Sequence, residues 1–195
     1  KHISERLLTL RDFADDFLLP SYRNEGKKVG YCAQHCLLDQ VSELGKGCLS
    51  QGEIGELIGE DEGAVRVSNA WIGTKDTVTA LHWDSYENLF VQLVGFKRVT
   101  LFRKDQTKYL YIPEATDGDG DGDGDGDGDG AGAQGNMSPV CVEDSRGEND
   151  VKYPNFKLAE RLEVVLGPGD ALYIPEGVWH HVRSLSTSAS VNYWF

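Results

Sequence analysis

His82 and Asp84 stand two residues apart in the stretch Thr79-Ala-Leu-His-Trp-Asp-Ser-Tyr-Glu-Asn88. In a β-strand, side chains two residues apart point to the same face. This spacing lets an imidazole nitrogen and a carboxylate oxygen bind one metal ion. A second histidine from elsewhere in the chain would complete a two-histidine, one-carboxylate set, which is typical of non-haem iron oxygenases.

The candidate for that second histidine lies near the far end of the chain, in Val178-Trp-His-His-Val182. His180 and His181 are adjacent, so in a strand they point to opposite faces. One of them can face the metal and the other cannot. Spacing alone leaves open which of the two is the ligand.

Four further side chains indicate a pocket for a 2-oxoacid beside the metal. Lys97 falls on the apolar face of an expected strand, where a lysine needs an anionic partner. A 2-oxoacid that chelates the metal carries a distal carboxylate, which Lys97 can pair with. Tyr31, Thr79 and Asn88 offer further hydrogen-bonding groups. Each has an ordinary structural reading alone, but their combination around the metal pair favours the pocket.

Many short strands separated by Gly and Pro turns position these residues. We expect strands at residues 64–71, 77–84, 88–94, 97–103, 163–166, 171–174, 179–184 and 189–195. A helix is expected from Ser4 to Leu18, ended by Pro20, and a Pro-containing turn with a short helix in 153–162. Residues 30–44 are expected to mix a short strand with a helical turn near Asp39, 105–115 to be a loop or short helix, and 45–63 to be loop. This pattern predicts a mainly β fold, an antiparallel double-sheet barrel or jelly roll with a few flanking helices.

Composition is consistent with one folded domain over residues 1–195, with 39% hydrophobic residues. The formal net charge is −13, and seven of the negative charges are the aspartates of an Asp-Gly repeat between Asp117 and Gly130. A nucleic-acid surface would need a basic stripe, which the chain lacks. An acidic chain is compatible with a basic peptide substrate.

The Asp-Gly repeat predicts a disordered surface insertion at about 116–136, because glycine frees the backbone and the aspartates repel one another. A calcium-binding repeat is the alternative, but such repeats need a longer period with an apolar residue to stack. No apolar run approaches the ~20 residues of a membrane span, and no signal peptide is visible. Four cysteines without a Cys-x-x-Cys pair are typical of reduced thiols. We therefore expect an intracellular location, in the nucleus and/or the cytoplasm.

Almost the whole chain, apart from the insertion, resembles the JmjC oxygenases, which are Fe(II)- and 2-oxoglutarate-dependent members of the cupin-like double-stranded β-helix class. The likeness is greatest to the small JmjC arginyl-hydroxylase branch. Since the chain starts at Lys1 rather than Met, it is expected to be a fragment of a longer protein. The stretches that carry the resemblance are Val29-Gly-Tyr-Cys-Ala-Gln-His35, Asn69-Ala-Trp-Ile-Gly73, Leu81-His-Trp-Asp84, Asn88-Leu-Phe-Val-Gln-Leu-Val-Gly-Phe-Lys97, Gly167-Pro-Gly-Asp170, Ile174-Pro175, Trp179-His-His-Val-Arg183 and Val191-Asn-Tyr-Trp194.

The resemblance implies that His82, Asp84 and His180 bind the iron, because the ligand histidine of the family directly follows the tryptophan. The other implied roles are 2-oxoglutarate binding by Tyr31, Thr79, Asn88, Lys97, Asn192 and Trp194, and a place at the substrate entrance for Trp71. The chain departs from the family in its acidic insertion, in Trp83 between the two ligands, and in Thr79 where relatives often have serine.

The implied activity is that of a dioxygenase that uses Fe(II), 2-oxoglutarate and dioxygen to hydroxylate a protein side chain, with arginine as the expected target. One alternative is Nε-methyl-lysine demethylation of a basic, histone-like substrate with the same iron chemistry. Another is a cupin-like binding module without catalysis. The expected partner is a protein or peptide, with no direct role for nucleic acid or a membrane, and the sequence does not predict an oligomeric state.

Overall fold

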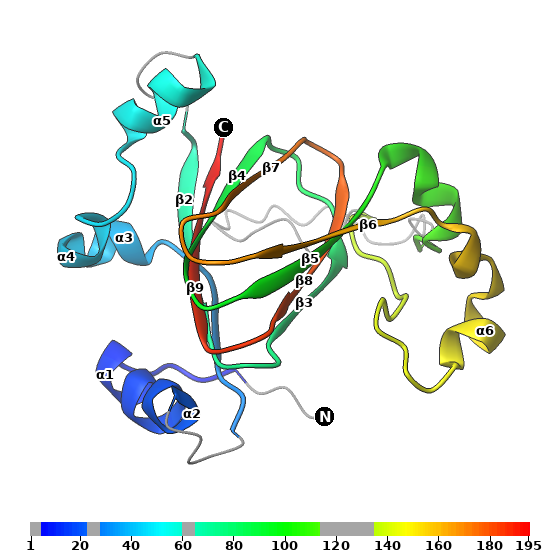
Figure 1. The fold of residues 1–195 in the computed structure, drawn as a ribbon, viewed down its shortest axis with the longest axis horizontal. Coiled ribbons are helices and arrows are strands. Elements are labelled where there is room, and N and C mark those ends of the chain that lie inside the picture. Colours follow the sequence, from blue (N-terminus) through cyan, green and yellow to red (C-terminus); the bar gives the residue numbers. More distant parts are fainter. Residues whose placement is uncertain (1–4, 23–27, 60–64, 114–134) are drawn as a thin grey trace, which may run out of the picture.

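The computed structural model of the chain describes residues 5–22, 28–59, 65–113 and 135–195, in which nine strands form two antiparallel sheets. The larger sheet has the order β1-β2-β9-β4-β7 and the smaller one the order β3-β8-β5-β6. The two sheets face one another and enclose a barrel (Figure 1). The strands are β1 Tyr31–His35, β2 Val67–Gly73, β3 Val78–His82, β4 Asn88–Val94, β5 Lys97–Phe102, β6 Leu162–Leu166, β7 Ala171–Ile174, β8 Trp179–Ser184 and β9 Ser188–Trp194.

This architecture confirms the predicted mainly β double-sheet barrel. Strands from the end of the chain occupy central positions, since β9 pairs with β2 and β4, and β8 pairs with β3 and β5. The last fifth of the sequence therefore contributes to both walls of the barrel interior. None of the helices in the part of the chain that the structure describes is long and apolar enough to cross a membrane.

The first helical region corrects the expected helix end at Pro20. It runs as α1 Leu10–Phe13, a π-helical turn η1 Ala14–Leu18, and α2 Leu19–Tyr22, so Pro20 lies inside it. Proline has no N–H to donate, and the preceding π-turn changes the hydrogen-bond register ahead of it. The expected N-cap Ser4 lies outside the described residues, and the observed N-cap is Thr9, whose side chain accepts from the Asp12 N–H.

The expectation of loop throughout residues 45–63 is wrong, because α5 Gln51–Ile58 lies within this stretch. A capping box begins this helix: the Ser50 hydroxyl accepts from the Glu53 N–H, and the Glu53 carboxylate accepts from the Ser50 N–H at 2.8 Å. The Ser-x-x-Glu spacing is a recognised start signal that outweighs the helix-weakening glycines. The other short helices are α3 Leu37–Gln40, α4 Ser42–Gly45, η2 Lys104–Tyr109, α6 Glu148–Lys152 and η3 Pro154–Leu158.

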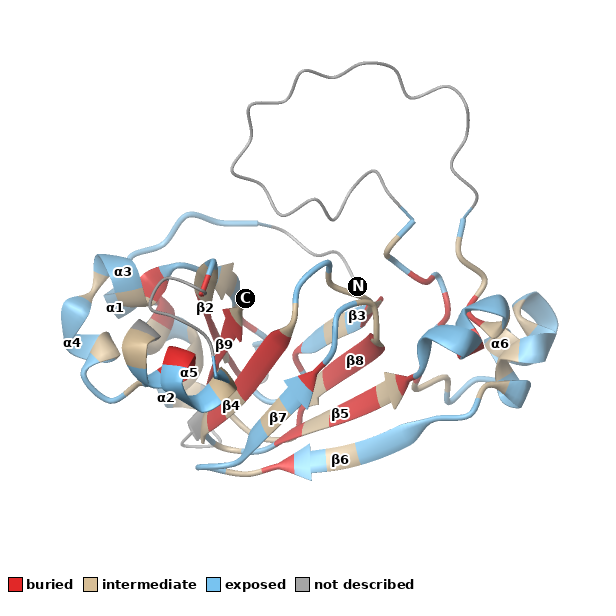
Figure 2. Cartoon of the chain, turned by 90° about the horizontal axis from the view of Figure 1, so that it is seen from above, coloured by how far each residue is buried: buried red, intermediate tan, exposed pale blue. Residues whose placement is uncertain are grey.

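Alternation along β9 divides the apolar core from the interior of the barrel. Val191 and Tyr193 point outward and pack with Ile54 of α5, whereas Ser190 and Asn192 point inward. Figure 2 shows that the buried residues follow the central strands β4, β5, β8 and β9. A second apolar cluster, which includes Phe102 and Trp179, covers the outer face of the smaller sheet. A third cluster, which includes Phe90, packs between the two sheets and borders the polar interior, since Lys97 Nζ lies 5.3 Å from the centre of the Phe90 ring.

The predicted disordered insertion, at about 116–136, lies mostly in residues 114–134, outside the described residues. Its last expected residue, Asn136, is placed beside β3: its carbonyl oxygen accepts from the Trp83 N–H at 3.1 Å. Met137 then forms an isolated antiparallel bridge with His82. The chain therefore returns from this segment directly beside the predicted metal ligands.

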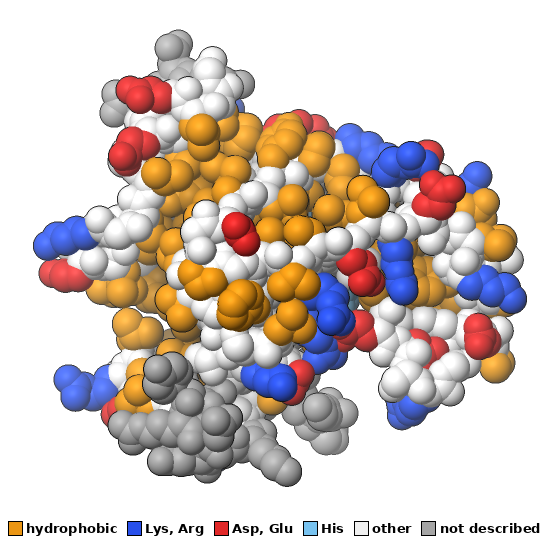
Figure 3. Space-filling view, viewed as in Figure 1, with side chains coloured by type: hydrophobic (Ala, Val, Ile, Leu, Met, Phe, Trp, Pro, Cys, Tyr) orange, Lys and Arg blue, Asp and Glu red, His pale blue; other side chains and the backbone are white. Residues whose placement is uncertain are grey.

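Strand β6 is an edge strand of the smaller sheet, and β7 is an edge strand of the larger one. Leu162 and Val165 on β6 and Tyr173 on β7 are exposed, and Figure 3 shows hydrophobic side chains gathered over these strands. This face is separate from the polar interior of the barrel.

Candidate metal centre

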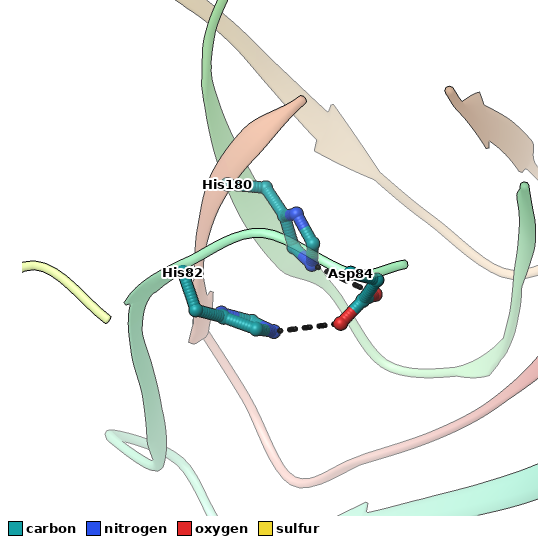
Figure 4. Close-up of side chains that lie close together, drawn as sticks. All are labelled: His82, Asp84 and His180. Atoms are coloured by element: carbon teal, nitrogen blue, oxygen red, sulfur yellow. Dashed lines mark ion pairs between the residues drawn. The ribbon is translucent and has the colours of Figure 1, made fainter. Parts of the chain in front are cut away.

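The side chains of His82, Asp84 and His180 point toward one another (Figure 4). Each offers one ligand atom, and these atoms lie within 4.8 Å of one another. His82 Nε2 is 3.5 Å from Asp84 Oδ1, and His180 Nε2 is 3.5 Å from Asp84 Oδ2. The three side chains are therefore placed to hold one metal ion between them.

Backbone contacts fix which nitrogen of each histidine faces the Asp84 carboxylate. His82 Nδ1 lies 2.8 Å from the carbonyl oxygen of Ala80, and His180 Nδ1 lies 3.0 Å from that of Val178. A carbonyl oxygen only accepts, so each Nδ1 carries the proton and donates it. The Nε2 lone pairs are then free for the metal, as in most histidine-ligated sites.

An irregularity in β3 brings Thr79 and His82 to the same face. Thr79 pairs with Val182, and His82 pairs with His180, so three steps on β3 oppose two on β8. This extra residue is a β-bulge, which re-aims the side chain that follows it. Asp84 lies two residues beyond the end of β3, so a loop rather than the expected strand alternation carries it to His82.

The structure decides between the two adjacent histidines that spacing left open. His180 faces Asp84 in the interior, whereas His181 pairs with Thr100 across the smaller sheet and points to the opposite face. Burial, reinforced by the nearby His82, lowers the pKa of His180 to about 4. His180 is therefore neutral at physiological pH, as a metal-binding imidazole must be.

A chain of amide hydrogen bonds holds the Asp84 carboxylate. Asn88 Nδ2 donates to Asp84 Oδ2 at 3.2 Å, and Asn192 Nδ2 donates to Asn88 Oδ1 at 3.2 Å. Trp71 Nε1 donates to Asn192 Oδ1 at 2.6 Å. The described bonds of Asn88 thus orient the carboxylate, and the predicted roles of Asn88 and Asn192 in cosubstrate binding stay predictions.

Lys97 lies in the same interior without an anionic partner. Its side chain is 1% exposed, and Nζ donates to the Ser190 hydroxyl at 2.6 Å. In the part of the chain that the structure describes, no carboxylate forms an ion pair with it. Burial lowers the pKa of Lys97 to about 7. A buried ammonium of this kind is stabilised when an anion enters beside it.

Tyr31 and Thr79 meet next to this lysine. The Tyr31 hydroxyl and Thr79 Oγ1 are 3.0 Å apart, and Lys97 Nζ lies 5.8 Å from the centre of the Tyr31 ring. Burial raises the pKa of Tyr31 to about 12, so the phenol keeps its proton and can donate it. The structure thus brings together the predicted hydroxyl donors and the predicted cation.

The two predicted tryptophans take different positions. Trp71 is 9% exposed and lies inside the barrel, with its ring centre 6.1 Å from that of Tyr31. Its predicted place at the substrate entrance stays a prediction. The Trp194 ring stacks on Tyr86, and its Nε1 is buried without a hydrogen-bond partner among the described residues.

Ser190 bonds the predicted site residue Lys97, and the sequence prediction missed it. Its signal was the alternation of polar residues along Ser188, Ser190 and Asn192 in the terminal strand, which marks one polar face. That face lines the barrel interior because the alternate residues pack against α5.

The sequence matches the cupin-like domain family over residues 2–195, and the chain belongs to this family. It is 39% identical over 204 residues to JmjC domain-containing protein F of Dictyostelium discoideum, covering 98% of this chain and 42% of that protein. It is 36% identical over 199 residues to Lysine-specific demethylase 8 of Danio rerio, covering 98% of this chain and 41% of that protein. The chain thus spans about two fifths of the length of these relatives.

A solved structure of Bacillus subtilis oxalate decarboxylase aligns with a TM-score of 0.37 at 14% identity, covering 68% of this chain and 21% of that one. This score is too low to bear on function. The fold assignment rests instead on the family match and on the two antiparallel sheets.

Proposed function

We propose that this chain is the catalytic part of an Fe(II)- and 2-oxoglutarate-dependent dioxygenase that oxidises a side chain of another protein. The observation that carries the proposal is the presence, in one barrel, of the His82–Asp84–His180 cluster and the buried Lys97 without a carboxylate partner. The relatives named as JmjC proteins and as a lysine-specific demethylase support the same class.

The donor set fits iron. Two imidazole nitrogens and one carboxylate are the facial ligand set of non-haem Fe(II) oxygenases, and this set leaves coordination positions open for small molecules. His82, Asp84 and His180 would hold the ion, and the bonds from Ala80, Val178 and Asn88 would fix their orientation. Bound iron with 2-oxoglutarate and dioxygen supplies the oxidant for an unactivated C–H bond, with succinate and carbon dioxide as coproducts.

The interior also fits the distal carboxylate of 2-oxoglutarate. Lys97 supplies the positive charge, and the Tyr31 and Thr79 hydroxyls supply neutral donors on the same side. A charge-assisted bond in a site without water is stronger than one at the surface. Holding the cosubstrate by this tail would orient its other end toward the three ligands.

The target residue is proposed to be arginine, on the resemblance to the arginyl-hydroxylase branch and on the acidic charge of the chain. A second candidate is demethylation of Nε-methyl-lysine, which the name of the Danio rerio relative favours. The two differ in products: demethylation releases formaldehyde, whereas hydroxylation adds one oxygen atom to the peptide.

Succinate formation from 2-oxoglutarate with Fe(II), ascorbate and a library of basic peptides tests this proposal. We expect turnover in the wild type and its loss in His180→Ala, while His181→Ala, which changes the outward-facing neighbour, retains metal binding. Mass spectrometry of the peptides distinguishes added oxygen from lost methyl groups. Full turnover in His180→Ala would contradict the site assignment.

A further inference from the structure

Tyr86 lies in the loop that carries Asp84, and its ring stacks on Trp194. The two ring centres are 5.5 Å apart with an interplanar angle of 21°. Tyr86 follows Asp84 by two residues, in the loop between β3 and β4. Trp194 pairs with Asn88, whose side chain bonds the Asp84 carboxylate. The aromatic pair is therefore built onto the same backbone that positions the metal ligand.

The indole N–H of Trp194 is available to a ligand. Trp194 lies on the inward face of β9 with Asn192, and its Nε1 is buried with no acceptor among the described residues. A buried N–H without an acceptor destabilises the protein, and an acceptor atom of a bound molecule would supply the missing hydrogen bond. Trp194 thus offers a buried, unpaired donor on the inward face of β9, and Tyr86 stacks against its ring.

Tyr86 itself is 43% exposed, and its hydroxyl makes no hydrogen bond to another described residue. Stacking on Trp194 fixes its ring while one part of the ring remains open to solvent. The ring face of tyrosine attracts cations, and the planar guanidinium of arginine can stack on it as well as be attracted by it. A lysine ammonium gains only the first of these two effects.

The charges of the β3–β4 loop and of the turn before β8 favour the same ligand. Glu87 follows Tyr86 directly, and its carboxylate accepts from the backbone N–H of Glu176 at 3.1 Å, which ties the loop to the turn before β8. Glu176 is exposed. Lys104, which packs against Gly177 in that turn, adds one positive charge. The loop and turn therefore carry more carboxylates than cations, and this excess of negative charge attracts a cationic side chain.

We propose that Tyr86, stacked on Trp194, is the specificity-determining residue that receives the guanidinium of a substrate arginine at the metal centre. This inference rests on the proposed oxidation of a protein side chain and adds the residue that selects it. Tyr86 contacts the substrate and takes no part in holding the metal or 2-oxoglutarate.

Nuclear magnetic resonance of the isotope-labelled chain loaded with Zn(II) and 2-oxoglutarate tests the proposal without turnover. The four tryptophans give four indole N–H signals, and Trp194→Phe identifies that of Trp194. We expect Nα-acetyl-arginine methylamide to shift the Trp194 signal, and the neutral citrulline analogue to bind at least about threefold more weakly. Tyr86→Ala should weaken arginine binding at least about threefold, and Tyr86→Phe should stay within about twofold.

Tyr153→Ala is the matched control, since Tyr153 also packs against another aromatic ring, Tyr111, but lies between α6 and η3, away from the β3–β4 loop in the chain. It should bind the arginine probe as the wild type does. Equal binding of the probe by Tyr86→Ala and wild type, or equal binding of arginine and citrulline, overturns the role of Tyr86. If the wild type forms no succinate with any peptide, the proposed function fails, and the binding experiment still decides on Tyr86.

Discussion

Lys97 Nζ donates a 2.6 Å hydrogen bond to the hydroxyl of Ser190, a residue 93 positions later in the chain, and this is its one hydrogen bond to another described residue. A serine hydroxyl does not neutralise an ammonium group. The interior therefore holds a positive charge whose burial is unfavourable until an anion arrives. This imbalance makes the proposed cosubstrate site testable by both stability and binding.

Replacing Lys97 by methionine should stabilise the cosubstrate-free protein and remove its affinity for 2-oxoglutarate. Burial lowers the pKa of Lys97 from 10.5 to about 7, so between these values the unfolded chain binds more protons and wild-type stability rises with pH. The gain in the variant, on the order of 2 kcal/mol, should be greatest below pH 7 and shrink toward pH 10.5. Urea unfolding across this range measures it.

Lys75 is exposed, so Lys75→Met is the control for that experiment. We expect it to change the free energy of unfolding by no more than about 0.5 kcal/mol. Unchanged 2-oxoglutarate affinity in Lys97→Met would show that the lysine does not bind the distal carboxylate.

The affinity for 2-oxoglutarate should fall as pH rises above about 7. Only the protonated lysine pairs with the carboxylate. Above pH 7, Lys97 is neutral in an increasing fraction of the free protein, and this fraction must take up a proton before it binds 2-oxoglutarate. The apparent dissociation constant should rise about tenfold per pH unit above that value. Calorimetric titration in buffers of different ionisation enthalpy measures both the affinity and the proton uptake. 2-Oxobutyrate lacks the distal carboxylate, so its affinity should not fall with pH. The same pH dependence of affinity for both ligands would show that Lys97 is not the cause.

Asn88→Ala should weaken metal binding by about 10- to 100-fold, because the Asp84 carboxylate loses the amide that orients it. Titration with Mn(II) or anaerobic Fe(II) gives the dissociation constant. Asn155→Ala, an exposed asparagine on η3, serves as the comparison and should bind metal as the wild type does. An unaltered constant in Asn88→Ala would mean that the hydrogen bond does not support the ligand.

Gly73→Ala should displace Tyr31 and so weaken 2-oxoglutarate binding. A Cβ at Gly73 would lie 2.8 Å from Tyr31 Cδ2 and 3.0 Å from Thr77 Cγ2, which is closer than packed atoms allow. We expect a stability loss of about 1–3 kcal/mol together with the weaker binding. At Gly47 an added Cβ meets nothing within 4 Å, so Gly47→Ala should change neither quantity. Wild-type affinity in Gly73→Ala would show that the position of Tyr31 is not needed.

The sequence by itself determined the class of fold and most of its strands. Alternating residues and Gly/Pro turns are local signals. The strands from β2 to β9 lie close to the residue ranges that these signals predict. Local signals also failed where two of them competed. The glycines of residues 45–63 favoured loop, but the Ser50–Glu53 capping box and the burial of Ile54 form a helix there. Pro20 likewise lies within helical structure that continues past it.

Only the tertiary structure decided which groups meet. Adjacent positions such as His180 and His181 are equivalent in the sequence, and the pairing of β8 with β3 and β5 turns one inward and the other outward. The bulge in β3, the loop that brings Asp84 to the histidines, and the contact of Lys97 with Ser190 likewise arise between segments far apart in the chain. Strand register and the packing of the two sheets set these contacts, and neither is encoded by the spacing of residues within a single strand.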